Sequence, residues 1–442
     1  MHDCLVIGGG LAGVEAAAQL SAAGLRVTLA EMKPVRFSPA HKSERLAELV
    51  CSNSLKAERL ASAAGLLKHE MHMLGSICVP AALSCRVPAG GALAVDRDLF
   101  SEAVTARIEE DPNITLVREE ITDLPDDRPV IVAAGPLASD ALSQSIQKRC
   151  GGFLSFFDAA APIVTAESVD MQSAFGASRY DRGGEEDYLN CPMDKAEYEA
   201  FYAALVSAER AKLHEFEKGK DIYEGCMPIE VMAQRGADTI RYGPLKPVGL
   251  RDPRTGHRPW AVLQLRRENA AGTLYNLVGF QTNLKFSEQQ RVFSMIPALH
   301  DAEFVRYGVM HRNTFLDAPR ILNADFSTKE NPLLFFAGQI TGVEGYMESA
   351  ASGLLAGRNL ARRLLGKAPF IPPEETMLGA LCRHVSTENR NYQPMGANFG
   401  ILPPLPERVR DKKLRYEAIA ARAVDAMQCA LDAEDGIQGD TI

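Results

Sequence analysis

The stretch DCLVIGGGLAG at residues 3–13 joins a short apolar run to a glycine-rich turn. Its first five residues are typical of a buried parallel strand. An alanine-rich amphipathic segment follows at 11–23 and ends before Gly24, and a second apolar run at 26–30 leads to Glu31. We therefore expect a strand–helix–strand unit of the Rossmann type, whose first turn matches the pattern G-x-G-x-x-G.

Each glycine of this turn has a physical reason in a dinucleotide site. Gly8 allows a tight turn, Gly10 lets the backbone approach a pyrophosphate, and Gly13 lets the helix pack closely on the strand. The helix N-terminus adds N–H groups and the positive end of a dipole. Glu31 can accept hydrogen bonds from a ribose diol and would repel a 2′-phosphate, so FAD or NAD is favoured over NADP. The cofactor-binding residues expected here are Gly8, Gly9, Gly10, Leu11, Ala12, Gly13 and Glu31.

The chain is expected to return to the same domain much later. Residues 129–136 (PVIVAAGP) and 333–338 (LLFFAG) are both typical of a strand followed by a glycine turn. The second is followed by QITGVEG at 339–345 and by a helix expected over 346–365. This return favours FAD, because a second helix N-terminus beside the flavin stabilises negative charge on the reduced ring. The chain has no second G-x-G-x-x-G and no CxxC or CxxxxC motif, which argues against a disulfide reductase.

The composition is that of an ordinary soluble enzyme. The chain has 442 residues, 46% of them hydrophobic and 24% charged, which predicts two or three domains and excludes a disordered or fibrous chain. The net charge of −9 means that any nucleic-acid contact must come from a local basic patch. The nine cysteines form no paired clusters, so we expect no metal site and no disulfide framework. Without a signal peptide or a long apolar run, the expected location is the cytoplasm.

We expect an α/β chain with a Rossmann-type FAD-binding domain and an inserted smaller α+β domain, as in two-domain flavoproteins. The first part of the FAD-binding domain takes residues 1–181, the insert takes 182–330, and the return with the C-terminal helices takes 331–442. The boundary at 182 rests on the polar turn DRGGEED at 181–187. The elements expected in the insert are helices at 194–217 and 228–235 and paired strands at 261–265 and 274–280.

Two cysteines precede expected helices. Residues 44–75 are expected to be helical, with Asn53 or Ser54 as an internal N-cap, so Cys51 would lie at a helix N-terminus with Lys56 close by. Cys226 precedes a helix that Pro228 would open. Helix N-termini and nearby cations favour the thiolate, which predicts that at least one of these thiols is catalytic. The alternative for each is a small buried side chain without chemistry.

A basic stretch lies inside the expected insert. Residues 235–267 contain eight lysines and arginines, two aspartates and Trp260, the only tryptophan of the chain. Basic side chains interleaved with an aromatic ring suit an unpaired or flipped RNA base. The candidate RNA-binding residues are Arg251, Arg254 and Arg258. A solvated loop rich in Arg and Pro is the alternative.

Five longer motifs resemble those of a known enzyme family. VIGGGLAGVEAA (6–17), LVCSNSLKAE (49–58), YEGCMPIEVMAQRG (223–236), YGVMHRNTF (307–315) and FFAGQITGVEGYMESAASGLLAGRNLARRL (335–364) are similar to motifs of the folate- and FAD-dependent tRNA (uracil-5-)-methyltransferases, the TrmFO family. The resemblance extends from residue 1 to about 400. The related GidA/MnmG tRNA-modifying flavoproteins share AGQ-x-x-G near residue 337. They also carry a long helical C-terminal extension, for which this chain has no room.

The resemblance implies a reaction and its participants. 5,10-Methylenetetrahydrofolate supplies the carbon, reduced FAD supplies the electrons, and NADPH or NADH reduces the flavin again. The product is 5-methyluridine at position 54 in the T-loop of tRNA, and the methylene passes through the flavin. No obligate protein partner and no membrane are implied.

The resemblance also implies roles for single residues. Cys226 becomes the nucleophile that adds to uracil C6, and Cys51 becomes the acid/base. Chemistry alone explains why a thiolate is needed, since uracil C5 is a poor nucleophile until C6 is attacked, but it leaves the order of the two cysteines open. Further implied residues are Gly338, Gln339 and Tyr346 at the flavin and His311 at the folate. A packing role is the alternative for Tyr346 and His311.

Three other functions are compatible with the sequence. The same chemistry on a ribosomal RNA uridine is the first. The second is a flavin oxidoreductase that acts on a small molecule and uses both thiols structurally. The third is a non-enzymatic RNA-binding factor that keeps FAD for its structure.

Overall fold

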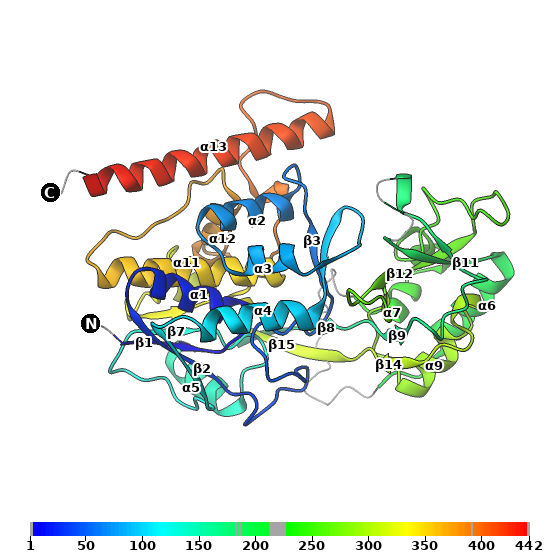
Figure 1. Cartoon of the computed structure of the whole chain (residues 1–442), viewed down its shortest axis with the longest axis horizontal. Helices are drawn as coiled ribbons and strands as arrows, with labels where there is room; N and C mark the ends of the chain where they lie inside the picture. Colours follow the sequence, from blue (N-terminus) through cyan, green and yellow to red (C-terminus); the bar gives the residue numbers. More distant parts are fainter. Residues whose placement is uncertain are drawn as a thin grey trace.

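The structure is a computed structural model that describes residues 3–151, 153–181, 184, 187–211, 227–389 and 392–439. Two units lie next to each other along the long axis of the molecule, and the second is the green part of Figure 1. Each unit has its own cluster of buried apolar side chains. Among the described residues, each unit therefore has a main hydrophobic core of its own, beside which two smaller buried clusters lie.

A parallel sheet forms the centre of the first unit. Its five strands lie in the order β16 (Leu334–Phe336), β7 (Val130–Val132), β1 (Asp3–Ile7), β2 (Arg26–Glu31) and β6 (Ile114–Arg118), and every pair is parallel. With α1 (Leu11–Ala22) between β1 and β2, the predicted strand–helix–strand unit is confirmed. Strand β16 pairs with β7, so the predicted late return of the chain to this sheet is confirmed too.

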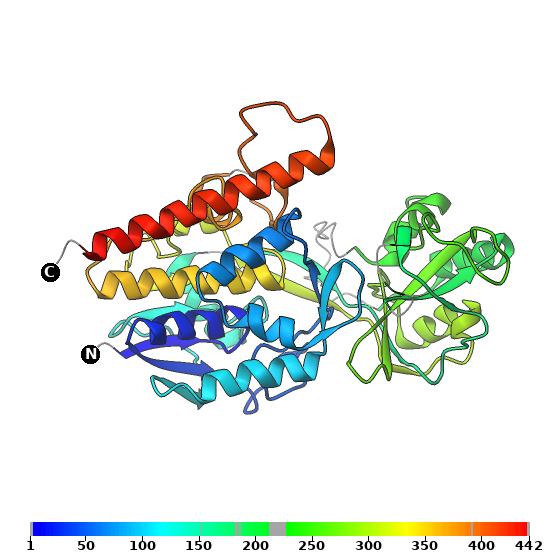
Figure 2. The ribbon, with the colours of Figure 1, turned by 45° about the horizontal axis from the view of Figure 1, so that its top comes forward.

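Helix α11 (Tyr346–Leu364) packs directly on α1, as Figures 1 and 2 show from two sides. The approach is so close that it requires glycine. A Cβ at Gly353 would lie 2.0 Å from the carbonyl oxygen of Ala12, and a Cβ at Gly357 would lie 2.5 Å from that of Ala16. The contact brings the N-termini of both helices to the edge of the sheet where the parallel strands end.

The other helices cover the rest of the first unit. They are α2 (Ala63–Met73), α3 (Cys78–Ser84), α4 (Arg97–Glu109), α5 (Asp140–Cys150), α10 (Ala318–Ile321), α12 (Met377–Ser386) and α13 (Lys412–Gly439). Helix α13, drawn in red, is the outermost in Figures 1 and 2. A small sheet joins β3 (Ser54–Ala57), β5 (Ala92–Val95) and β4 (Arg86–Val87). Within the described ranges, no helix combines the length and the apolar character that crossing a membrane requires.

The second unit is built on an antiparallel sheet of six strands. Their order is β10 (Phe175–Gly176), β11 (Leu189–Met193), β12 (Ala261–Arg267), β13 (Leu274–Leu277), β9 (Ile163–Thr165) and β14 (Phe304–Arg306). Helices α6 (Lys195–Ser207), α7 (Ile229–Ala233), α8 (Ala237–Tyr242) and α9 (Phe286–Phe293) complete it. The predicted pairing of the strands near 261 and 274 is confirmed.

Two long strands connect the units. Strands β8 (Phe153–Ala159) and β15 (Met310–Leu316) pair with each other over their whole length. Strands β9 and β10 follow β8 and already belong to the antiparallel sheet. The expected boundary at 182 therefore falls inside this sheet, and we propose that the insert runs from about residue 160 to about residue 309.

The helix predicted over residues 44–75 is wrong in its first half. Residues 44–53 are not helical, residues 54–57 form β3, and α2 begins at Ala63, with the Ser62 hydroxyl accepting a hydrogen bond from the Gly65 N–H at 3.2 Å. The reason is tertiary, because Ser54 and Ala57 pair with β5, which the helical pattern of this stretch does not reveal. Cys51 therefore does not lie at a helix N-terminus.

The helix predicted over residues 194–217 begins as expected and ends early. Asp194 and Glu197 form a capping box, with N–H···O distances of 2.7 and 2.8 Å. The helix ends at Ser207, since the chain at Ala208 is extended and Arg210 forms a bridge with Leu284. Residues 212–217 lie outside the described residues.

Candidate active site

A cavity opens at the edge of the parallel sheet where β1, β7 and β16 end. It is lined by the turn after β1, the end of β2, the turn after β7 and the first turn of α11. The predicted cofactor residues that line it are Gly8, Gly10, Leu11, Ala12, Glu31, Gly338, Gln339 and Tyr346. Two segments far apart in the sequence thus form one elongated site.

A side chain at the glycines of the first turn would clash with the backbone at some positions and find open space at another. Gly8 has a φ of +105°, and its Cβ would lie 2.6 Å from the carbonyl oxygen of Ala133, while a Cβ at Gly13 would lie 1.7 Å from that of Gly8. A Cβ at Gly10 would meet no protein atom within 4 Å. The protein's own packing thus requires Gly8 and Gly13, whereas the space at Gly10, the N-cap of α1, fits a pyrophosphate.

Glu31 organises the turn as well as facing the cavity. Its carboxylate accepts hydrogen bonds from the N–H groups of Gly9 at 2.7 Å and of Lys33 at 3.0 Å. Each oxygen can accept at least one further bond, so the carboxylate can still bind a ribose diol. Nearby, burial and the positive charge of Lys33 lower the pKa of His41, so this end of the cavity presents a neutral imidazole.

Tyr346, which also lines the cavity, contacts the Cys51 loop, which we define as residues 49–54. The phenol oxygen of Tyr346 accepts hydrogen bonds from the N–H of Cys51 at 2.7 Å and of Ser52 at 3.2 Å. Cys51 and Tyr346 both line the cavity. The first residue of α11 therefore places a thiol beside the site that the sequence assigns to the flavin.

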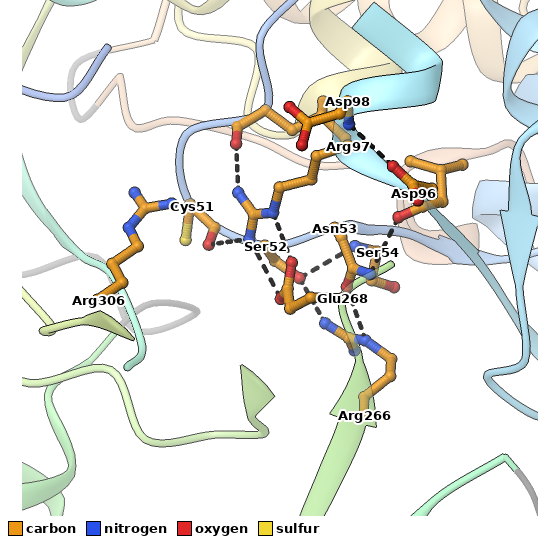
Figure 3. Close-up of polar contacts among 12 residues, drawn as sticks. Cys51, Ser52, Asn53, Ser54, Asp96, Arg97, Asp98, Arg266, Glu268 and Arg306 are labelled. Atoms are coloured by element: carbon orange, nitrogen blue, oxygen red, sulfur yellow. Dashed lines mark hydrogen bonds and ion pairs between the residues drawn. The ribbon is translucent and has the colours of Figure 1, made fainter. Parts of the chain in front are cut away.

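Arg97, at the start of α4, holds the Cys51 loop from the first unit. Its guanidinium donates to the carbonyl oxygens of Leu49 and of Cys51, the latter at 2.9 Å, and to the buried carboxylate of Glu268 at 2.6 Å. Burial opposes the charge on Arg97, but the Glu268 carboxylate outweighs it and raises the pKa of Arg97. Figure 3 shows this pair between the Cys51 loop and the end of β12.

Two further arginines reach the same loop from the second unit, as Figure 3 shows. Buried Arg266 of β12 donates from Nε to the Asn53 side-chain oxygen at 2.9 Å and from Nη2 to the Ser52 hydroxyl at 2.8 Å. Arg306 of β14 donates to the carbonyl oxygen of Val50. The Cys51 loop is therefore part of the seam between the two units.

These arginines give Cys51 a positive environment. Burial and the charge of Arg97 lower the pKa of Arg306, whereas its electrostatic interactions with Tyr346 and Cys51 act in the opposite direction. Arg97 interacts with Cys51 in the same way. A neighbouring cation favours the thiolate form of a cysteine. Lys56, the cation expected beside Cys51, instead pairs with Glu348 at 2.7 Å.

Two of the predicted residues cannot be placed as side chains. Cys226 lies outside the described residues, directly before the chain that leads to α7. His311 belongs to β15, where its backbone pairs with Asp158 of β8, and its side chain is outside the described part. The neighbouring Asn313 of the same strand lines the cavity.

The predicted basic residues lie in the second unit, away from the lining of this cavity. Arg254 is held by an ion pair with Asp252, with a 2.6 Å distance between Nη2 and Oδ2. Arg251 and Arg258 are exposed and line a separate depression. Trp260 is half-buried, and the Arg241 guanidinium lies 3.7 Å from the centre of its ring.

Comparisons with known proteins show the family to which the chain belongs. The family model described as glucose inhibited division protein A matches residues 3–368. A protein of Moorella thermoacetica is 56% identical over 95% of this chain and 96% of its own, and one of Enterococcus faecalis is 57% identical over 97% and 99%. Both are named methylenetetrahydrofolate–tRNA-(uracil-5-)-methyltransferase TrmFO. The chain belongs to the TrmFO family.

The fold of this TrmFO family member is also found in a more distant protein. Aquifex aeolicus GidA matches 97% of this chain and 73% of its own, with a TM-score of 0.70 and 17% identity. At that identity the likeness concerns the fold alone. It confirms the predicted fold class, a GidA-like α/β flavoprotein fold with two units.

The side chains that hold the Cys51 loop of this TrmFO chain are not recognisable from the sequence. Arg97, Arg266 and Arg306 come from three different elements, and Glu268 follows a strand of the second unit. No short motif connects them. The one available signal was a charged residue next to an apolar run, as for Arg266 at the end of AVLQLRR.

Proposed function

We propose that this protein methylates C5 of uridine 54 in the T-loop of tRNA, with 5,10-methylenetetrahydrofolate as the carbon donor and FAD as the redox cofactor. One observation carries the proposal. The Cys51 loop and the dinucleotide turn line the same cavity, with Tyr346 bonded to that loop. A thiol beside a flavin site suits a uracil methylation that needs both removal of the C5 proton and reduction.

Bound FAD supplies the electrons, and the folate supplies the carbon as cosubstrate. The residues that would hold FAD are Gly8, Gly10, Glu31, Gly338 and Tyr346, from the two segments that meet in the cavity. Gly10 offers backbone and the positive end of α1 to a pyrophosphate, and Glu31 offers its carboxylate to the ribose. We propose NADPH or NADH as the external reductant.

The thiols have separate tasks in this proposal. Cys226 attacks C6 of the uracil, which makes the ring an enolate and C5 a nucleophile. Once C5 carries the new carbon, Cys51 takes the C5 proton, and the C6–sulfur bond breaks. Arg97 and Arg306 support this role because they favour a negative charge on the Cys51 sulfur. His311 is proposed for the folate pocket, and Arg251, Arg254 and Arg258 for the RNA.

Trapping with a fluorinated RNA tests this assignment. A tRNA that carries 5-fluorouridine at position 54 has no C5 proton to release, so the thiol that attacks C6 stays bound to it. We expect Cys226→Ala to keep its flavin spectrum and to form no adduct. Cys51→Ala should still form an adduct, because it retains the attacking thiol. An adduct that persists in Cys226→Ala would overturn the assignment of the nucleophile.

A further inference from the structure

A second depression lies in the seam between the two units, beyond the Cys51 loop. Its walls come from Glu58 and Arg59 after β3, Gly90 and Gly91 before β5, and residues of the second unit around Tyr180. A third depression contains Arg251 and Arg258. Ser178 and Tyr180 line both, so the two depressions share one wall.

Two strands lead from the Cys51 loop to this place. Strand β3 directly follows the loop and ends just before Glu58 and Arg59. On β12, Arg266 bonds to the loop, while Gln264 lines the depression. Residues two apart on a strand share one face and lie roughly 7 Å apart. The same two strands, β3 and β12, therefore contribute residues to the Cys51 loop or its contacts and to the depression.

Tyr180 has an unusual backbone at the junction. Its φ of 59° and ψ of 28° are left-handed, which is uncommon for a bulky side chain and costs about 1 kcal/mol or more. The strain is held in place, since the Tyr180 N–H donates to the Gly249 carbonyl at 3.0 Å. Arg179 bonds to Gln264 at 2.8 Å and to the Val248 carbonyl at 3.1 Å.

The Tyr180 ring is supported and accessible at once. It lies so close to Gly249 that a Cβ there would be 2.9 Å from ring atom Cε1. Even so, Tyr180 is 51% exposed. Arg59, Arg251 and Arg258 are exposed around it, while the carboxylate of Glu58 is paired with Arg86. A rigid, accessible ring among cations has the chemistry that binds unpaired RNA.

We propose that Tyr180 stacks an unpaired base of the substrate RNA that neighbours the methylated uridine, and that Arg59, Arg251 and Arg258 bind the adjoining phosphates. The inference rests on the proposed function. A uridine that enters the cavity must leave its stack, and this separates it from its neighbours. The Tyr180 ring, in a depression built on the same strands as the Cys51 loop and its contacts, would give a neighbouring base a new stacking partner. The backbone strain at Tyr180 is the cost of presenting that ring.

Equilibrium binding of an unmodified tRNA transcript to the FAD-loaded protein tests the proposal. Tyr180→Ala should raise Kd and KM by about tenfold or more, with kcat and flavin reduction unchanged. Tyr180→Phe, which keeps the ring, should stay close to wild type. Tyr180→Asn, which tolerates the left-handed backbone, should lose affinity like the alanine variant. Tyr242→Ala, at a tyrosine that is 60% exposed on α8, is the matched control and should change nothing.

Unchanged affinity in Tyr180→Ala and Tyr180→Asn would overturn the proposal. So would a loss of kcat and melting temperature in both variants at constant KM, because that pattern belongs to a structural residue. A failure of the proposed function can be distinguished from a failure of the stacking proposal. If wild type binds tRNA and Tyr180→Ala does not, but no methyl is transferred by either, the stacking role stands and the methylation is refuted.

Discussion

At the scale of single residues, two glycines of the first turn are required for different reasons, one by the packing of the protein itself and the other by the ligand. Gly13 and Gly10 belong to the same pattern, yet a Cβ would meet a backbone oxygen at 1.7 Å in the first case and no atom within 4 Å in the second. The φ of −76° at Gly10 suits any residue. Glycine at position 10 is therefore explained by the cofactor.

Substitution of these two glycines should have opposite consequences. Gly10→Ala should keep the melting temperature of the FAD-free protein and weaken FAD binding about tenfold or more, because one methyl group in a filled space costs about 1–3 kcal/mol. Gly13→Ala should lower the melting temperature strongly even without FAD. Thermal unfolding of the FAD-free proteins and titration with FAD measure both effects. Equal FAD affinity of Gly10→Ala and wild type would contradict this reading of the site.

The role of a residue could be predicted from the sequence where a local pattern determines that role. Gly8, Gly13 and Glu31 lie where the strand–helix–strand pattern put them, because each role depends on neighbours within one such unit. The surroundings of Cys51 could not be predicted. Its cations, Arg97 and Arg306, come from two units, and Arg306 is more than 250 positions away in the chain.

At the scale of elements, helices that begin against buried carboxylates hold the first unit together. The Glu70 carboxylate of α2 accepts hydrogen bonds from the first N–H groups of α12, those of Met377 at 2.9 Å and Leu378 at 2.8 Å. Glu15 of α1 does the same for the start of α3, through the N–H of Cys78 at 3.0 Å. Each carboxylate joins two helices that are distant in the sequence.

The titration of Glu70 should make the free energy of unfolding depend on pH. Burial raises the pKa of Glu70 from 4.5 to about 8, although the two N–H groups oppose the shift. The folded state then binds a proton that the unfolded state has lost, so the free energy of unfolding falls between about pH 4.5 and pH 8. Glu70→Gln lacks this titration. Its stability relative to wild type should therefore increase as pH rises through that window.

Urea unfolding at about pH 5 and about pH 8 measures this difference. Glu374→Gln, which changes an exposed carboxylate close to α12, is the control and should show no pH-dependent difference. A difference between Glu70→Gln and wild type that is the same at both pH values would show that Glu70 titrates normally.

Helices were predicted correctly where turn or capping residues flank an amphipathic stretch. Helix α1 has a glycine turn before it and Gly24 after it, and α6 has its capping box. The prediction failed at residues 44–62, where a helix was expected, and over 54–57 the pairing of Ser54 and Ala57 with β5 decides the conformation. A pattern within one segment does not report a partner strand that lies about 40 residues later.

At the scale of the whole molecule, the seam between the units positions the Cys51 loop. Arg266 and Arg306 contribute from the second unit, while Arg97 and Tyr346 contribute from the first. The site is thus complete only when both units are in place. The late return of the chain to the parallel sheet was predictable from the strand-and-glycine pattern at 333–338, but the seam was not.

Loss of the Arg266 contact, which comes from the second unit, should change the position of the Cys51 thiol without loss of bound FAD. Arg266→Gln leaves the side chains of Asn53 and Ser52 without a charged partner, which costs about 1.5–3 kcal/mol locally. We expect kcat to fall at least tenfold with FAD content unchanged, and alkylation of Cys51 to change in rate when followed on its peptide. Arg291→Gln, at an exposed arginine of α9, is the control. Wild-type turnover in Arg266→Gln would show that the seam does not position Cys51.

The most direct test of the central claim is methyl transfer itself. The purified yellow protein is incubated with methylenetetrahydrofolate labelled in its one-carbon unit, with NADPH, and with an unmodified tRNA transcript or its uridine-54→cytidine variant. We expect label in the first transcript alone, recovered as 5-methyluridine. Equal label in both transcripts, or none in either while NADPH still reduces the flavin, would contradict it, and the second result would direct the search to ribosomal RNA or to a small-molecule substrate.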